Sequence, residues 1–307
     1  MSNPPHLPAS PRATAGRLTP GDIAALYRTI DDLVTLDTIR GSTGLAPRAA
    51  AEFRTAAARL GADPRAARDA AAVVAELGEV AAWIAHDADD QPASRRLAGE
   101  ALLIARRAGD VNMERFLVSH LSMQAAHLGR GTEALALADR ALAGGPRSKR
   151  VRAMFAVRRA RGLALLGDRD AALDALAAAR SLLADSVRIE DPQWTWWLHE
   201  AELAIHEARI RAAVGDLRGA VDLSARSVAV LPPRQGRDAA LYRAWLLHDL
   251  VAVGAWSDAS GVAGELRARG GAARTARVAG IVARTLALAE RAAAPTAVKD
   301  ALHALAV

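Results

Sequence analysis

Several residue types are scarce or absent in this chain of 307 residues, and each absence excludes a class of protein. No cysteine is present, which excludes disulfide bonds, thiolate metal sites and a cysteine nucleophile. The absence of cysteine fits a reducing compartment, so we expect a cytoplasmic protein. There is no run of about 18 apolar residues, so we expect no membrane span. The segment 1–16 lacks the apolar core of a secretory signal.

Lysine is nearly absent as well. Only Lys149 and Lys299 are lysine, so 38 of the 40 basic side chains are arginine, and alanine supplies about a quarter of the chain. We interpret this bias as the result of GC-rich coding rather than of selection for a binding surface. The net charge of +6 is small for this length and permits an acidic partner without requiring one.

Aromatic residues make up only 4% of the chain. Little aromatic and β-branched content, much Ala, Leu, Arg and Glu, and apolar residues three and four apart favour helices over strands. The pairs Thr19-Pro20, Asp63-Pro64 and Asp191-Pro192 are typical of helix starts, because a capping oxygen precedes a proline at the first helical position. Before the first pair, residues 1–18 form a Pro/Ala-rich segment without apolar periodicity, which we predict to be disordered.

A repeat is the most informative feature of the sequence. A short motif with a glycine at its second position occurs at Leu128–Ala134, Leu166–Ala172, Val214–Ala220 and Val253–Ala259, with a degenerate earlier copy at Ala88–Ser94. Successive copies are 40, 38, 48 and 39 residues apart. Each motif separates an apolar segment from an Ala-rich one, as in stacked helix–turn–helix repeats.

Small residues recur at fixed positions after each turn. One lies five residues after the turn position, at Ser94, Ala134, Ala172, Ala220 and Ala259. Another lies twelve residues after it in four copies, at Ala101, Ala141, Ala179 and Ser227, whereas the fifth copy has Leu266. Positions seven apart share a helix face, so small side chains there allow the second helix of a hairpin to approach the first closely.

These patterns predict an all-α fold, a right-handed α-solenoid of tetratricopeptide-like helical hairpins. We expect a helical lead-in over 19–62, about five hairpins within 63–270, and C-terminal capping helices over 271–307. Because stacked repeats contact mainly their neighbours, such a molecule should be curved.

Other segments resemble a known family. They are Ala82–Asp87, Ala101–Asp110, Ser122–Gly129, Asp191–Trp194 and His199–Leu203. In their order and spacing they are similar to the helical-repeat region of actinobacterial transcriptional regulators of the Xre type. The resemblance implies a regulatory role. In those regulators a helix-turn-helix domain precedes the repeats, but here only a short Pro-rich segment precedes Leu18, so DNA readout by this chain is not implied.

Catalytic and metal-binding motifs are missing from the sequence. There is no HExxH, GxSxG, phosphate-binding loop or GxGxxG. The pairs His120/His127 and His199/His206 are each seven residues apart. That spacing is about 10.5 Å along a helix, which is too far for one metal ion. We therefore expect no enzyme, no catalytic residue, no metal and no cofactor.

The first helix of each hairpin lines the concave face in tetratricopeptide-like stacks, so counting back from each turn gives the residues of a candidate groove. The predicted groove residues are Glu76, Trp83, Ser119, Met123, His127, Arg161, Glu202, Arg209 and His248. This mixed set of acidic, basic and apolar side chains suits an extended peptide or a polar small molecule.

Two further clusters have both a structural and a functional interpretation. Trp194 and Trp197 lie three apart, and they either fill volume between Ala-lined helices or anchor a partner. A basic run between Arg147 and Arg161 begins with Arg147, Lys149, Arg150 and Arg152. It is either a solvated helix face or a contact for phosphate groups.

The leading functional hypothesis is a non-enzymatic regulatory protein that binds a peptide, a small molecule or a partner protein in its groove. The first alternative is a constitutive scaffold between proteins. The second is direct nucleic-acid binding through the basic run, which predicts retention on heparin and a steep salt dependence. A homodimer is compatible with all three hypotheses.

Overall fold

We analysed a computed structural model of the chain. It describes residues 18–42, 44–62, 68–184, 188–230, 236–269 and 275–306. The predicted disordered tail, apart from Leu18, and the predicted helix start at Asp63-Pro64 lie outside these ranges.

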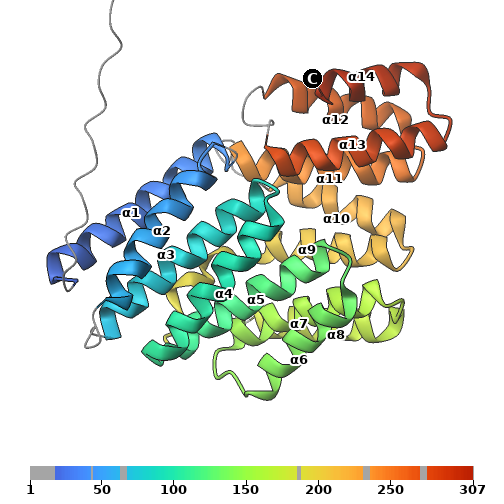
Figure 1. Cartoon of the computed structure of the whole chain (residues 1–307). Coiled ribbons are helices and arrows are strands. Elements are labelled where there is room, and N and C mark those ends of the chain that lie inside the picture. Colours follow the sequence, from blue (N-terminus) through green and yellow to red (C-terminus); the bar gives the residue numbers. More distant parts are fainter. Residues whose placement is uncertain are drawn as a thin grey trace, which may run out of the picture.

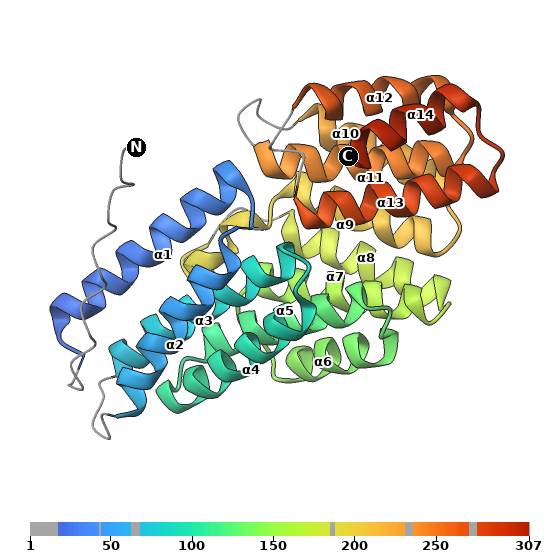
Figure 2. The same cartoon turned by 45° about the horizontal axis from the view of Figure 1, so that its top comes forward.

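Helices account for all of the regular secondary structure in the described ranges. They are α1 (Pro20–Arg40), α2 (Ala46–Gly61), α3 (Arg68–Asp87), α4 (Gln91–Ala108), α5 (Val111–His127), α6 (Gly131–Ala143), α7 (Lys149–Leu165), α8 (Arg169–Leu183), the 3-10 helix η1 (Gln193–Trp197), α9 (Glu200–Ala213), α10 (Leu217–Ala229), α11 (Gly236–Ala252), α12 (Trp256–Ala268), α13 (Ala276–Arg291) and α14 (Thr296–Ala306). They stack in chain order (Figures 1 and 2), so the fold is an α-solenoid of helical hairpins. None of these helices is both long enough and apolar enough to cross a bilayer.

Five turns connect the paired helices at the positions of the sequence motif. The second residue of each turn has a left-handed backbone, with φ between 62° and 86°, at Asp89, Gly129, Gly167, Gly215 and Gly254. In each turn the residue after the left-handed one donates its backbone N–H to the carbonyl of the residue five positions before it, over 2.8–3.0 Å. This hydrogen bond is the Schellman arrangement that ends a helix. Glycine adopts the left-handed backbone without strain, and aspartate is one of the few other residues that tolerate it.

A further turn of the same kind joins α13 to α14. Ala293 has φ 51°, and the Ala294 N–H donates to the carbonyl of Ala289 over 2.9 Å. Ala293 lies 39 residues after Gly254, which continues the repeat spacing. The sequence pattern missed this hairpin because alanine replaces the glycine that marked the others.

The small residues bring the two helices of each hairpin into close contact. Ser94, Ala134, Ala172, Ala220 and Ala259 are all fully buried. Gly162 in α7 packs even more tightly, because a Cβ there would lie 2.9 Å from the backbone nitrogen of Leu135 in α6. Alanine and glycine at these positions therefore set the distance between neighbouring helices.

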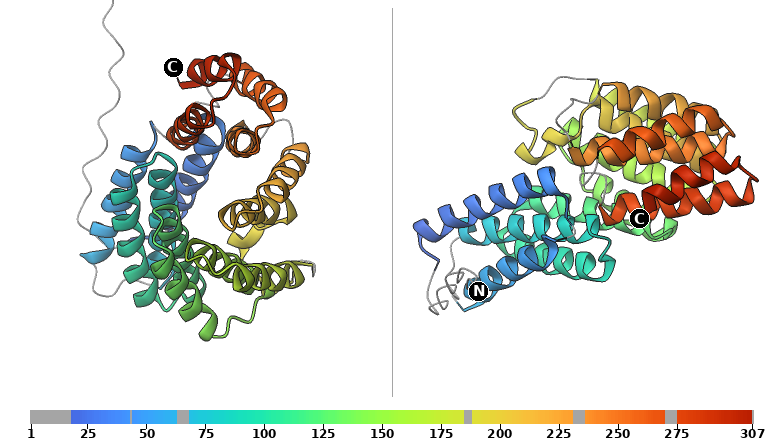
Figure 3. Two further views of the ribbon diagram at one scale, coloured as in Figure 1. Left: turned by 90° about the vertical axis from the view of Figure 1, so that its right-hand side faces the viewer. Right: turned by 90° about the horizontal axis from the view of Figure 1, so that it is seen from above.

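The two ends of the solenoid meet. α1 contacts α11, and Figure 3 shows the chain curling round until its last helices lie beside its first. Arg277 at the start of α13 donates to the buried carboxylate of Asp87 at the end of α3, over 3.0 Å and across 190 residues of sequence. The Arg277 guanidinium also lies 5.8 Å from the centre of the Trp83 ring. The stack is thus closed into a ring, and we call the side of the first helices that faces into the ring the inner face.

The long spacing of 48 residues accommodates an insertion between α8 and α9. Its 3-10 helix η1 brings Trp194 parallel to Phe116 of α5, with ring centres 4.4 Å apart. The indole N–H groups of Trp194 and Trp197 are buried and have no hydrogen-bond partner among the described residues. Because its ring already packs inside the chain, Trp194 fits the structural interpretation of the tryptophan cluster better than the partner-anchor interpretation.

The close approach at Gly162 generates a stability prediction. Gly162→Ala should lower the free energy of unfolding by about 1–3 kcal/mol, because the added methyl overpacks the contact with the Leu135 backbone. Urea unfolding followed by circular dichroism measures this change. Gly261→Ala in α12 is the matched control, since nothing lies within 4 Å of its Cβ position. It should be neutral or stabilise the protein by up to about 1 kcal/mol, and equal effects of the two substitutions would refute the prediction.

The closure generates a second prediction. Arg277→Ala should remove the ion pair with the buried carboxylate of Asp87 and destabilise the closed ring by about 3 kcal/mol or more. Small-angle X-ray scattering should show a larger radius of gyration, and the melting temperature should fall. Arg48→Ala, at an exposed position on α2, should change neither quantity. An unchanged scattering profile for Arg277→Ala would show that the ion pair does not hold the ring closed.

Candidate binding site on the inner face

Three predicted groove residues from three different helices meet at one pocket. Arg161 of α7, Arg209 of α9 and His248 of α11 line a pocket of about 210 Å³. The remaining lining residues are Ala212, Ala213, Leu217, Trp245, Asp249 and Ala252. Stacking aligns successive first helices, so side chains at equivalent positions of neighbouring repeats converge.

Arg209 is held on both sides within this pocket. Its guanidinium forms an ion pair with Asp249 and lies 4.4 Å from the centre of the Trp245 ring. Asp249 also accepts a hydrogen bond of 2.8 Å from the hydroxyl of Ser224, and its side chain is only 1% exposed. The Nε of Arg209 and one carboxylate oxygen of Asp249 are buried without a hydrogen-bond partner among the described residues. The pocket therefore contains polar atoms that the fold itself leaves unsatisfied.

Arg161 has no acidic partner in the described part of the chain. It donates to the backbone carbonyl of Arg209 over 2.7 Å. Burial, together with the charge of Arg209, lowers the pKa of the Arg161 guanidinium to about 10. Arg161 is still charged at neutral pH, so it supplies a positive charge that no nearby carboxylate neutralises.

His248 supplies a neutral polar group. Burial lowers its pKa to about 4, with additional repulsion from Arg209 and Arg284. The ring Nδ1 of His248 lies within hydrogen-bond distance, 3.0 Å, of the hydroxyl of Thr285. A neutral imidazole carries one N–H donor and one acceptor nitrogen, so Nε2 remains as the second polar atom of the ring.

Two other predicted groove residues lie at the closure of the ring. Trp83 is close to Arg277, and His127 packs edge-on against His86 with ring centres 5.0 Å apart. Burial lowers the pKa values of both histidines, and the charge of Arg277 lowers them further. These side chains belong to the contact between the two ends rather than to the pocket. In the described ranges, no cluster of His, Asp and Glu is suited to hold a metal ion.

Glu202 makes a third polar site on the inner face. It accepts a hydrogen bond from the hydroxyl of Tyr242, and its carboxylate lies 3.3 Å from Nε2 of His206. Burial alone would raise the pKa of Glu202, but the hydrogen bonds from His206 and Tyr242 lower it to about 2. Glu202 is thus engaged within the fold.

The remaining groove predictions do not reach the pocket. Ser119 is fully buried and accepts a hydrogen bond of 3.1 Å from Arg158, so its prediction as an open groove residue is wrong. Glu76 on α3 and Met123 on α5 are half-buried on other helices of the ring. Burial raises the pKa of Glu76, and the charge of Glu79 raises it further.

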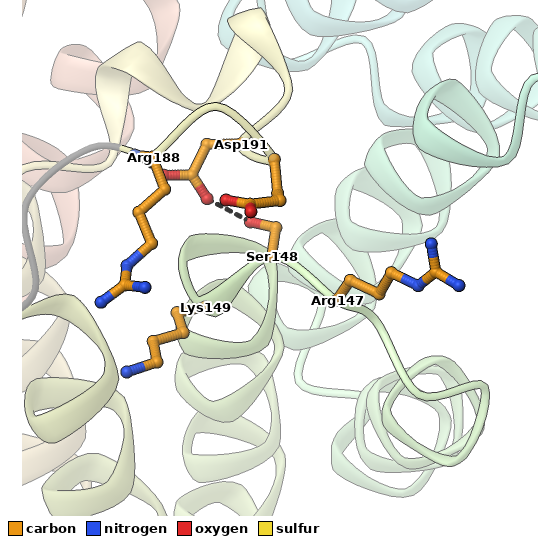
Figure 4. A pocket seen from close by; sticks show the side chains of 6 residues that line it. Arg147, Ser148, Lys149, Arg188 and Asp191 are labelled. Atoms are coloured by element: carbon orange, nitrogen blue, oxygen red, sulfur yellow. Dashed lines mark hydrogen bonds between the residues drawn. The ribbon is translucent and has the colours of Figure 1, made fainter.

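The basic run does not form one exposed patch. Figure 4 shows Arg147 pointing away from Lys149, while the hydroxyl of Ser148 donates to Asp191 over 2.6 Å. The prediction that Arg150 belongs to an exposed basic patch is wrong, because Arg150 is buried and donates to the carbonyl of Leu198 in the insertion.

The rest of the run confirms this separation. Arg152 is exposed, whereas Arg158 is buried on the inner face. A helix distributes consecutive residues over all of its faces, so a basic run in the sequence does not become a basic surface.

Trp245 and Asp249 are the functional candidates that the sequence analysis missed. Counting back from the turn selected His248 on α11, but it selected neither Trp245 nor Asp249, which line the same pocket. Trp245, His248 and Asp249 are three and four residues apart, so the helical periodicity contained a signal that could have identified them.

Comparison with known proteins identifies the fold alone. No protein-family model and no curated protein sequence matches the chain. One similar solved structure is that of a Rap protein complexed with Competence and Sporulation Factor, with 11% identity and a TM-score of 0.55 over 92% of this chain and 91% of that one. Another is BtubC from P. vanneervenii, with 19% identity over 78% and 88% of the two chains. Its TM-score of 0.44 is too low to support an argument.

The depressed pKa of His248 predicts a pH dependence of stability. The folded-state value of about 4 lies below the ordinary value of 6.5, so the unfolded chain binds more protons between these values and stability falls as the pH falls from 6.5 to 4. This shift corresponds to at most about 3 kcal/mol. His248→Asn keeps a donor for Thr285 and should flatten this part of the profile in urea unfolding. His303→Asn at an exposed position is the control, and an equal effect of the two substitutions would contradict the assignment.

Proposed function

We propose that this protein is a non-enzymatic binding protein that takes a peptide, or a short segment of a partner protein, on its inner face. The observation that carries the proposal is the convergence of Arg161, Arg209, Trp245 and His248 on one pocket. Residues from three repeats meet there, and an aromatic ring lies among charged and neutral polar groups. Such a combination provides both contact area and directional hydrogen bonds for a ligand.

The enclosed geometry supports a chain segment as the ligand. The pocket lies on first helices, which line the inner face, and the ion pair between Asp87 and Arg277 closes the ring around that face. An extended segment can offer one side chain to the pocket and others to neighbouring first helices. The similar Rap structure is complexed with Competence and Sporulation Factor, which supports the idea that a stack of this shape accommodates a ligand.

We extend the proposal to regulation. The resemblance to the repeat region of Xre-type regulators supports a role in transcriptional or developmental control, in the cytoplasm. Ligand binding would act by favouring one curvature of the ring or one oligomeric state, including a homodimer. A constitutive scaffold is the alternative, and it would form its complexes with or without a small ligand.

Nucleic-acid binding is the weaker alternative. It requires a cluster of cations on one face, but Arg150 and Arg158 of the basic run are buried. Only a part of the run therefore faces solvent, which disfavours this hypothesis.

The proposed function is tested by affinity selection from a synthetic library of random heptapeptides, read by mass spectrometry. The full chain should retain a subset of the peptides. Calorimetry with a retained peptide should show a Kd about 10-fold or more weaker for Arg161→Ala, because one charge-assisted hydrogen bond is lost.

One control variant accompanies this selection. Arg48→Ala at an exposed position should bind like the wild type. If no peptide is retained, or if Arg161→Ala binds every retained peptide as tightly as the wild type does, the proposal that a peptide is bound at this pocket fails.

A further inference from the structure

The pocket between α7, α9 and α11 has an excess of positive charge. Arg161 and Arg209 line it, and Asp249 is the only carboxylate among its lining residues. Arg209 and Asp249 form an ion pair, so the charge of Arg161 remains uncompensated. A third guanidinium, that of Arg284, lies 5.7 Å from the centre of the Trp245 ring. Two arginines, Arg209 and Arg284, therefore lie near the ring of one tryptophan.

The size of the pocket limits what it can hold. Its volume of about 210 Å³ equals that of about seven water molecules in the liquid, which is room for one amino-acid residue. Ala212, Ala213 and Ala252 line the pocket with short apolar side chains. A ligand group with a small apolar part and a compact charged end suits this lining.

We propose that this pocket binds a single carboxylate of a peptide ligand, either its terminal carboxyl group or the side chain of an aspartate or glutamate. This inference rests on the proposed function, because it names the chemical group that the inner face recognises. A guanidinium matches the two oxygens of a carboxylate in geometry and in charge. Arg161 supplies that guanidinium, and its contact with the Arg209 carbonyl over 2.7 Å holds it at the pocket.

The charge balance favours a monoanion over a phosphate group. Asp249 lines the pocket, so a ligand with a charge near −2 would meet a like charge there. Phosphate monoesters carry about −1.5 to −2 at neutral pH, whereas a carboxylate carries −1. Arg284 is not among the lining residues, so within the lining one uncompensated arginine, Arg161, and one carboxylate from the ligand neutralise each other.

His248 completes the recognition of such a group. Its Nδ1 is engaged by Thr285, so Nε2 is the ring nitrogen left for a ligand. The tautomer with the proton on Nδ1 makes Nε2 an acceptor for the amide N–H beside the carboxylate. The pocket thus offers a cationic donor and a neutral polar group to a carboxyl-bearing residue.

The test is a charge-swap selection with the full chain. A synthetic heptapeptide library is presented twice, once with free and once with amidated C-termini, and the retained peptides are sequenced by mass spectrometry. Wild-type protein should enrich Asp, Glu or a free C-terminus about 10-fold or more over their neutral counterparts, and the two forms of the library separate the two sources. Arg161→Glu should reverse the preference to Lys and Arg, while the control Arg48→Glu should select as the wild type does.

A second measurement separates this inference from the proposed function. N-acetylglycine is titrated into the protein, and the indole N–H resonance of Trp245 is followed, assigned by its absence in Trp245→Phe. It should shift with N-acetylglycine but not with N-acetylglycinamide, and the shift should disappear in Arg161→Ala. If this shift occurs while no peptide is retained, the carboxylate site stands and the peptide-binding function fails.

The opposite results overturn the inference. If neutral, amidated peptides are retained as well as acidic ones, or if Arg161→Glu keeps the wild-type preference, peptide binding stands and the carboxylate assignment fails. A Trp245 shift with inorganic phosphate that exceeds the shift with N-acetylglycine would replace the carboxylate with a phosphate group.

Discussion

The left-handed turn, combined with a small residue after it, is the constraint on which the rest of the structure depends. The turn residue, Gly129 or Gly167 for example, reverses the chain after one helix. Five residues later a fully buried Ser or Ala lets the returning helix pack almost backbone to backbone. Hairpins of the same thickness then stack in register, and that register brings Arg161, Arg209 and His248 together at one pocket.

Closure of the ring changes the electrostatics of the inner face. In an open solenoid the first helices would face water, which screens charges strongly. Here Arg277 pairs with Asp87 across the junction, and its charge helps to lower the pKa values of His86 and His127. Burial lowers the pKa of Arg284, and the charge of Arg277 lowers it as well. The Arg284 guanidinium lies 5.7 Å from the centre of the Trp245 ring at the pocket.

The insertion around η1 shows how an irregular segment adapts a repeat protein. The tryptophans lie within the longest interval between repeats, where the regular packing of alanine-lined helices is interrupted. Trp194 packs on Phe116, and Arg150 ties the start of α7 to the insertion. Large aromatic rings fill volume that small side chains leave empty. The same contacts explain why the basic run is divided, because one of its arginines is used to hold the insertion.

The sequence by itself determined the helical class, the turns and the hairpins, because these depend on local backbone preferences and on a periodicity that can be read along the chain. It also placed Arg161, Arg209 and His248 on one face. It missed the hairpin at Ala293, where no glycine marks the turn, and it missed Trp245 and Asp249. The closed ring, the burial of Ser119 and Arg150, and the unbalanced charge of Arg161 were decided only by the tertiary structure. They depend on residues up to 190 positions apart, and the small rotations between repeats that bring such residues together leave no local signal in the sequence.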